Sequence, residues 1–322
     1  MTMFDPILVP LDGSQLAECV LPHAIAIARA FHARIILLRV LERNQVNGTA
    51  QIFDLLNWQL KKTEAKLYLD KISTRLSKFQ LQISSTVLEG LVAESITEYA
   101  QSHGVKLLIL SSHGRSGMSQ WGISGAAQKI ILGARTSVLI VRAHQPAVSE
   151  LVEQQYRQIL VPLDGSQRAE YALPLVATLA RFQKSRTHIL HVVKTPEMAR
   201  HMPPTPEDID LSDRITARNR DEAMHYLEQV KWRSHLDGID VQAHLITSED
   251  AIVTLHGLVG QEHIDLLALS AHGYSGNDQW PYGSMVLNFI LYGKVPLLIV
   301  QDLPGKKETF IVEAATRERA EH

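Results

Sequence analysis

The sequence has little of what marks several common classes of protein. It contains a single cysteine, Cys19, so the chain can form neither an internal disulfide nor a multi-cysteine metal site. The chain has 34 acidic and 32 basic residues, so it has no excess of positive charge for non-specific binding of nucleic acid. No apolar run approaches the roughly 20 residues that cross a bilayer. Because the opening residues MTMFDPILVP also show no signal-peptide pattern, we expect a cytoplasmic protein that binds neither nucleic acid nor membrane.

The motifs of several enzyme classes are missing as well. The chain has no Gly-x-Gly-x-x-Gly and no Gly-x4-Gly-Lys-(Ser/Thr), the dinucleotide and P-loop signatures. Its 15 histidines show no His-Glu-x-x-His spacing, so we predict no metal site built from protein side chains. No Gly-x-Ser-x-Gly elbow supports a hydrolase triad. We therefore predict no catalytic residue.

What the chain does contain is an internal repeat. Residues 7–15, ILVPLDGSQ, recur letter for letter as residues 159–167, at an offset of 152. The offset grows to 158 where Glu64 matches Glu222, and it is 159 late in each half. A nine-residue identity followed in register by weaker matches indicates a duplication. We place the parts as follows: a first domain at 1–144, a linker at 145–156, a second domain at 157–303 and a charged tail at 304–322.

Each copy alternates strands with helices. Short apolar runs such as LLIL and VLIV are typical of strands buried on both faces, and the alternation implies a parallel sheet covered by helices on both sides. In the first copy we predict strands at 7–11, 34–40, 82–88, 106–110 and 138–141, and helices at 16–31, 61–79, 93–103 and 126–132.

Two loops in each copy follow strand ends, which is where open parallel sheets bind ligands. The first loop reads Pro-Leu-Asp-Gly-Ser, at residues 10–14 and 162–166. Its carboxylate could accept a hydrogen bond from a ribose hydroxyl or a base, and its glycine permits backbone conformations closed to other residues. A plain strand-to-helix turn with a serine cap is the alternative. The candidate ligand residues of this loop are Pro10, Asp12, Gly13, Pro162, Asp164 and Gly165.

The second loop follows the fourth strand and is bracketed by glycines, at residues 111–125 and 270–284. Backbone amides there could cradle phosphate oxygens, helped by the positive end of the helix that follows. His113 and His272 recur inside the loop, and each could touch a phosphate or hold the loop through a backbone hydrogen bond. A glycine-rich connection without a ligand is the alternative.

The two loops, their order and the strand–helix alternation resemble the universal stress protein family in its tandem form, in which two fused domains stand in for a homodimer. Nucleotide-binding members carry an Asp after the first strand. After the fourth strand they carry the motif Gly-x2-Gly-x9-Gly-(Ser/Thr), in which x is any residue. The resemblance covers nearly the whole chain outside linker and tail. It implies an α/β fold of two tandem copies of an open five-stranded parallel sheet with helices on both faces, Rossmann-like and nucleotide-binding. It also implies that the Asp loop and a second-strand residue meet adenosine.

The two copies match this pattern unequally. Both have a serine where the pattern has its first glycine. The second copy closes the loop with Gly283-Ser284, whereas the first has the pair reversed as Ser124-Gly125. The reversal puts a Cβ where a phosphate needs bare backbone, so we predict the second copy to be the better site. The further nucleotide-binding residues that the comparison implies are Val192, Ser270, His272, Gly273, Gly276, Gly283 and Ser284 in the second copy and Val40, Ser111, His113, Gly114, Gly117, Ser124 and Gly125 in the first.

The resemblance implies a stress-response protein that binds adenine nucleotide, ATP first and ADP or AMP as alternatives, as a sensor or regulator. Mg²⁺ would accompany the triphosphate. No residue presents itself as a base or as a strong stabiliser of charge, so we expect at most slow ATP hydrolysis. A nucleotide-free interaction protein of the same fold is the main alternative. We expect the strands at 138–141 and 297–300 to pair the two domains; a further homodimer and a protein partner are left open.

Overall fold

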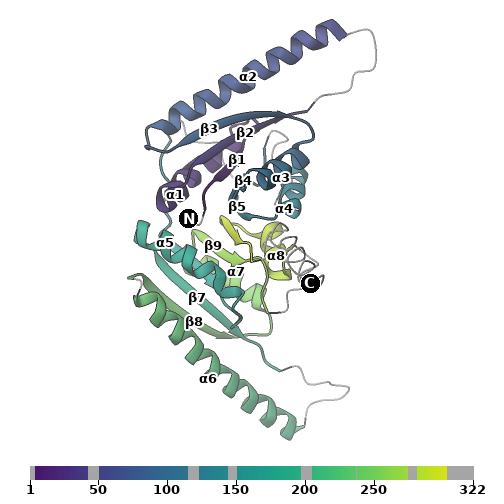
Figure 1. Ribbon diagram of the computed structural model, residues 1–322. Helices are drawn as coiled ribbons and strands as arrows, with labels where there is room; N and C mark the ends of the chain where they lie inside the picture. The colour runs from purple at the N-terminus through teal and green to yellow at the C-terminus, as the bar shows by residue number, and fades with distance from the viewer. Residues whose placement is uncertain are drawn as a thin grey trace, which may run out of the picture.

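The computed structural model describes residues 4–42, 51–114, 123–143, 151–196, 205–236, 238–274 and 281–302. They form one ten-stranded sheet with the strand order β3-β2-β1-β4-β5-β10-β9-β6-β7-β8 (Figure 1). Within each half the paired strands are parallel, and only the central pair, β5 with β10, is antiparallel. The predicted fold of two tandem five-stranded parallel sheets is therefore confirmed, and the sheets are joined edge to edge.

The same order of elements occurs in both halves. The first contains β1 (Ile7–Pro10), the 3-10 helix η1 (Ala17–Val20), α1 (Leu21–Phe31), β2 (Ile35–Leu41), α2 (Gln51–Ser77), β3 (Ile83–Glu89), α3 (Val92–Ser102), β4 (Leu107–Ser111), α4 (Gly125–Gly133) and β5 (Ser137–Val141). The second contains β6 (Gln158–Pro162), the 3-10 helix η2 (Ala169–Ala172), α5 (Leu173–Gln183), β7 (Arg186–Val193), α6 (Pro206–Leu236), β8 (Asp240–Thr247), α7 (Ala251–Gln261), β9 (Leu266–Ser270), α8 (Ser284–Tyr292) and β10 (Leu297–Val300).

The central strands are apolar on both faces because helices cover both faces of the sheet. Successive residues of β1 illustrate this: Ile7 and Val9 belong to one buried apolar cluster, whereas Leu8 belongs to the cluster on the opposite face. All three side chains are fully buried. The continuous apolar runs in the sequence thus correspond to strands at the centre of a three-layer arrangement.

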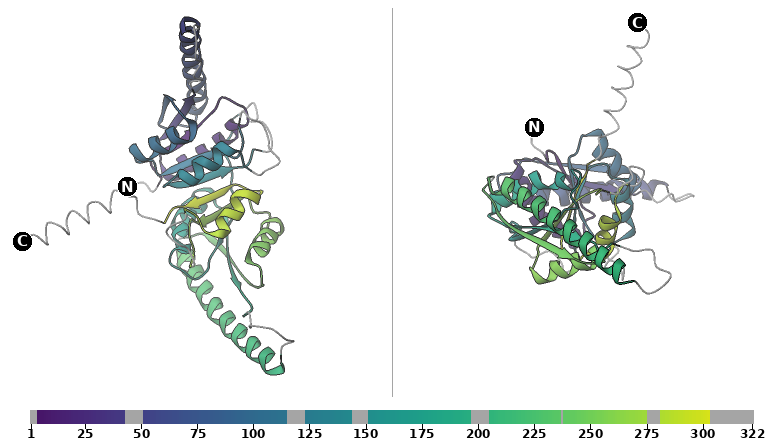
Figure 2. Two further views of the ribbon diagram at one scale, coloured as in Figure 1. Left: turned by 90° about the vertical axis from the view of Figure 1, so that its right-hand side faces the viewer. Right: turned by 90° about the horizontal axis from the view of Figure 1, so that it is seen from below.

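Two helices differ from the prediction. The helix expected at 16–31 is split into η1 and α1, because Pro22 at the start of α1 has no N–H to continue the α-helical hydrogen bonds. The helix expected at 61–79 begins at Gln51, as α2. Trp58 is buried on the same face of the helix as Ala65, seven residues later, so the helical spacing of buried residues begins before the predicted start at residue 61. The long helices α2 and α6 lie at opposite ends of the molecule (Figures 1 and 2).

The two halves meet along their last strands, as expected. The central pair joins Leu139 to Leu298. The offset of 159 makes these two residues equivalent, so a pseudo-two-fold axis passes between them. The flanking pairs, which the axis exchanges, are Ile140 with Leu297 and Val138 with Ile299.

Hydrogen bonds also cross between the copies, and two of them reach equivalent carbonyl groups from different donors. The Tyr282 hydroxyl donates to the carbonyl oxygen of Ile131 at 2.9 Å. The Arg142 guanidinium donates to the carbonyl oxygen of Ile290, the counterpart of Ile131, at 3.0 Å. In the described part of the chain, none of the helices is both long and apolar enough to span a membrane.

Candidate functional site

A cavity of about 890 Å³ lies in the second copy, where β6, β7 and β9 end. Its volume is within the range of small-molecule sites. The starts of α7 and α8 complete its wall. Of the residues predicted for the second copy, the cavity brings together Pro162, Asp164, Val192, Ser270, His272, Gly273, Gly283 and Ser284. Gly165 follows Asp164 outside the cavity wall, and Gly276, like Gly117 in the first copy, lies outside the described residues.

Asp164 fastens the two predicted loops to one another. One carboxylate oxygen accepts hydrogen bonds from the backbone N–H of Ser166 at 3.0 Å and from its hydroxyl at 2.6 Å. The other accepts from the backbone N–H of Tyr274 at 2.7 Å. A Cβ on Gly273 would overlap this second oxygen, so the clamp requires glycine there. The first task of this carboxylate is therefore to hold the loops in register, with lone pairs left for a ligand.

The first copy has the same aspartate and glycine next to one another. Asp12 accepts a hydrogen bond from the backbone N–H of Ser14 at 2.8 Å, and a Cβ on Gly114 would overlap its carboxylate. Gly13, at φ +85°, has the left-handed conformation that favours glycine. The other predicted residues of this copy lie at the ends of its elements: Pro10 ends β1, Val40 lies in β2, Ser111 ends β4, His113 follows it, and Ser124 and Gly125 begin α4.

The reversed glycine–serine pair changes how the following helix begins. In the first copy Ser124 is the N-cap of α4, and its hydroxyl accepts from the backbone N–H of Ala127 at 3.3 Å. In the second copy Gly283 is the N-cap of α8, with no side-chain cap among the described residues. Residues 283–287 line the cavity, so the first backbone amides of α8 open onto it. Uncapped amides at a helix N-terminus attract anions.

The first-glycine position holds a serine in both copies, but the two hydroxyls have different surroundings. Ser111 donates to the carbonyl oxygen of Leu16 at 3.2 Å and also contacts that of His113. The hydroxyl of Ser270 is buried in the cavity wall and has no hydrogen-bond partner among the described residues. A buried hydroxyl without a partner costs free energy unless something bound in the cavity meets it.

The two loop histidines are held in place by side chains. His272 Nδ1 lies 2.7 Å from a carboxylate oxygen of Asp302, which follows β10, and both side chains are buried. His113 Nδ1 instead lies 3.1 Å from the hydroxyl of Ser112. This contact of His272 is with a side chain, whereas the predicted attachment was a backbone hydrogen bond; a contact with phosphate stays a prediction. Asp302 is not predictable from the sequence, since nothing in the local pattern links it to a loop 30 residues away.

The sequence analysis also missed a charge difference at the mouth of the site. Lys194 lines the cavity, and its counterpart in the first copy is Glu42. Glu42 accepts from the backbone N–H of Val92 at 3.4 Å, at the start of α3, whereas α7 is capped by its own Asp250. The second copy thus has a lysine where the first has a carboxylate. Within the described ranges, no three His, Cys, Asp or Glu side chains are placed to hold a metal ion.

Comparison with known proteins identifies the fold and the family. The model of the universal stress protein family matches twice, at residues 3–142 and 155–301. Universal stress protein MJ0531 of Methanocaldococcus jannaschii is 26% identical over 142 residues, which is 44% of this chain and 83% of that protein. A universal stress protein of Archaeoglobus fulgidus superposes with a TM-score of 0.63 at 15% identity, covering 92% of this chain and 98% of that one. A functionally unknown protein of Pseudomonas aeruginosa superposes with 0.64 at 14% identity, over 93% of each chain. With both halves matched, the chain belongs to the universal stress protein family.

Proposed function

We propose that the second copy binds adenine nucleotide and that the protein acts as a cytoplasmic stress-response sensor or regulator. ATP is the first candidate, with ADP and AMP as alternatives. The observation that carries the proposal is the uncapped N-terminus of α8, which opens onto a cavity of about 890 Å³. The partnerless hydroxyl of Ser270 in the same wall supports it.

The adenosine would lie against Asp164 and Val192, at the ends of β6 and β7. The phosphates would meet the backbone amides of Gly273, Gly283 and Ser284, where the helix dipole favours negative charge. Mg²⁺ would enter with the triphosphate. No cluster of metal-binding side chains occurs in the described part of the chain, so the ion would be held chiefly by phosphate oxygens and water.

The test is nucleotide binding by the full chain. We expect mass spectrometry of the denatured protein to detect a released adenine nucleotide, and calorimetric titration to show ATP binding. No released nucleotide and no binding at millimolar ATP would contradict the proposal. Asp164→Ala should weaken binding more than Asp12→Ala does, and equal effects would contradict the ranking of the copies.

A sharper variant exchanges the closing pair between copies. Gly283→Ser with Ser284→Gly gives α8 the serine cap that α4 has, and should weaken ATP binding by about tenfold, the value of one or two lost charge-assisted hydrogen bonds. The matched control, Ser124→Gly with Gly125→Ser, uncaps α4 and should leave binding at the second copy unchanged. Weakening by both exchanges alike would indicate a general loss of stability.

A nucleotide-free interaction protein is the second candidate. The three hydrogen bonds that Asp164 accepts within the protein favour it, because the loops are held together without a ligand. The nucleotide experiments above separate the two candidates. A turnover assay with Mg²⁺ and ATP would reveal slow hydrolysis.

A further inference from the structure

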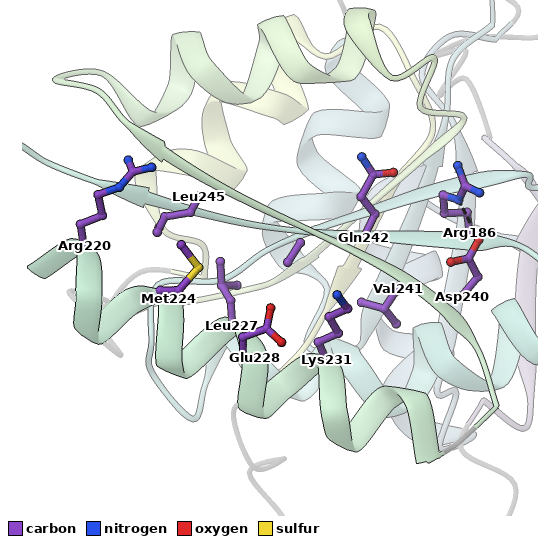
Figure 3. Close-up of a pocket in the computed structure, with 11 residues that line it drawn as sticks. Arg186, Arg220, Met224, Leu227, Glu228, Lys231, Asp240, Val241, Gln242 and Leu245 are labelled. Carbon is purple, nitrogen blue, oxygen red and sulfur yellow. Dashed lines mark hydrogen bonds and ion pairs between the residues drawn. The ribbon is translucent and has the colours of Figure 1, made fainter.

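A second cavity, of about 570 Å³, lies between α6 and β8 and shares no lining residue with the nucleotide pocket (Figure 3). It is an elongated groove at the outer side of the second copy. On its floor Val241, Ala243 and Leu245 alternate along β8 and pack on the side of Leu227 of α6. Met224 and the carboxylate of Glu228, both from α6, also line the groove, so its wall is mixed apolar and polar. Met224 is 45% exposed, which is high for a methionine beside a strand.

The groove runs beside an unpaired strand edge. β8 is the last strand of the sheet, and among the described residues no strand pairs with its outer side. Alternate N–H and C=O groups of such an edge are available to an added strand. Gln242, whose side chain alternates with those of Val241 and Ala243, also lines the groove, so the groove reaches the strand edge itself.

A basic side chain of α6 lies near each end of the groove. Arg220 lies near Leu245 and Lys231 near Val241 (Figure 3). These two α6 residues are eleven positions apart, which along a helix is about 16 Å. A strand covers that distance in about five residues. The Arg186 guanidinium donates a hydrogen bond to the Asp240 carboxylate at 2.7 Å, and the Arg220 guanidinium donates one to the Thr247 hydroxyl at 3.3 Å. These two bonds hold the arginine side chains in place against the two ends of β8.

The first copy differs from the second at several positions of this groove. The counterpart of Met224 is Lys66, and that of Ala243 is Ser85. Thr247 corresponds to Glu89, which accepts from the Trp58 indole at 3.1 Å and pairs with Lys62. The other floor positions stay apolar in the first copy, as Ile83, Val87 and Leu69, and Lys62 stands at the position of Arg220. The copies therefore differ at Met224, Ala243 and Thr247 and at Lys231, whose counterpart is Ser73.

We infer that the α6–β8 groove binds an extended segment of a partner protein, which adds as a strand to the free edge of β8. Alternate apolar side chains of the segment enter the groove, and acidic residues at its two ends meet Arg220 and Lys231. A strand satisfies the backbone groups of the edge as well as the apolar floor, whereas a compact ligand meets only the floor. The inference is independent of nucleotide binding, since the two cavities share no residue.

The probe is a fluorescein-labelled heptapeptide, Glu-Thr-Val-Thr-Val-Thr-Asp, added to the full chain at low ionic strength and followed by anisotropy. Its Glu, Val, Val and Asp share one face, as the groove requires. We expect saturable binding in the micromolar range. Lys231→Glu and Met224→Lys should each weaken it by about tenfold or more, through charge and through the apolar floor. The matched controls in α2, Ser73→Glu and Lys66→Met, should leave binding unchanged.

Backbone pairing has its own signature. In a strand, alternate amides face the partner edge, so N-methylating one alternating set of the peptide should abolish binding and N-methylating the other should not. The inference is overturned if the peptide does not bind, if both methylated sets bind equally, or if Ser73→Glu acts as strongly as Lys231→Glu. It is also overturned if the chain forms a dimer that Lys231→Glu dissociates, because a second copy would then occupy the edge.

Discussion

The two copies share a scaffold and differ where the scaffold meets a cavity or the other copy. In both, an aspartate after the first strand, Asp12 or Asp164, lies against the glycine that follows the fourth strand. The helix beyond that loop begins with a serine cap in the first copy and a glycine in the second. Because this contact occurs in both copies, the aspartate alone does not distinguish a ligand site. The helix start does distinguish the copies.

The largest effect is expected from Asp302→Ala. The change leaves the buried His272 without the carboxylate that lies 2.7 Å away, and removes the partner of Arg168 at 3.6 Å. Removing this buried acceptor leaves donors without a partner and costs about 3 to 4 kcal/mol of unfolding free energy. Urea unfolding followed by circular dichroism measures it. Ser112→Ala removes the hydroxyl beside His113, which also accepts from the backbone N–H of Ala143 at 3.1 Å, and should cost about 2 kcal/mol. Equal losses would mean that the two histidines are held alike.

The second prediction concerns pH and the contact between α1 and the second copy. His23 is buried, its Nδ1 lies 2.6 Å from the Tyr156 hydroxyl, and burial lowers its pKa from 6.5 to about 4. Between these two pH values the unfolded chain binds the proton and the folded chain does not. His23 therefore lowers the stability as pH falls from 6.5 to 4, by roughly 3 kcal/mol in total.

The pseudo-symmetric counterparts of His23 and Tyr156 are Leu175 and Phe4, which supply the control. The double variant His23→Leu, Tyr156→Phe makes the two contacts chemically alike without leaving the hydroxyl unpaired. Urea unfolding between pH 7 and pH 4 should show a shallower loss of stability in this variant than in the parent chain. The same slope in both would mean that His23 titrates normally in the folded protein.

The third prediction tests whether the two aspartate–glycine contacts are equivalent. Gly273→Ala and Gly114→Ala each place a Cβ against the carboxylate of Asp164 or Asp12, and each should cost about 2 kcal/mol of unfolding free energy. Only Gly273→Ala should also weaken ATP binding, measured by calorimetry, because the proposed site is in the second copy. Weakening by Gly114→Ala alone would place the nucleotide in the first copy.

Much of this comparison could be predicted from the sequence, because an exact nine-residue repeat aligns the two copies and apolar strands reveal a buried sheet. The pairing of the last strands was expected from the resemblance to the universal stress protein family, whereas the order of elements follows from those patterns. The roles of Ser124 and Gly283 do not, since a cap depends on where a helix starts to within one residue. Asp302 and Lys194 reach their positions only through the tertiary fold, so no local pattern singles them out.

The smallest effect is expected at the boundary between the copies. Tyr282 adjoins Gly283 in the pocket wall and is 2% exposed, while its hydroxyl donates to the Ile131 carbonyl of the other copy. Tyr282→Phe removes one neutral hydrogen bond and keeps the ring, so it should cost about 1 kcal/mol in urea unfolding. Ile123 is the counterpart of Tyr282, so the bond links only the second site to the other copy. If the bond also positions Gly283, the variant will weaken ATP binding as well. Unchanged ATP affinity with lowered stability would make Tyr282 a contact of the interface alone.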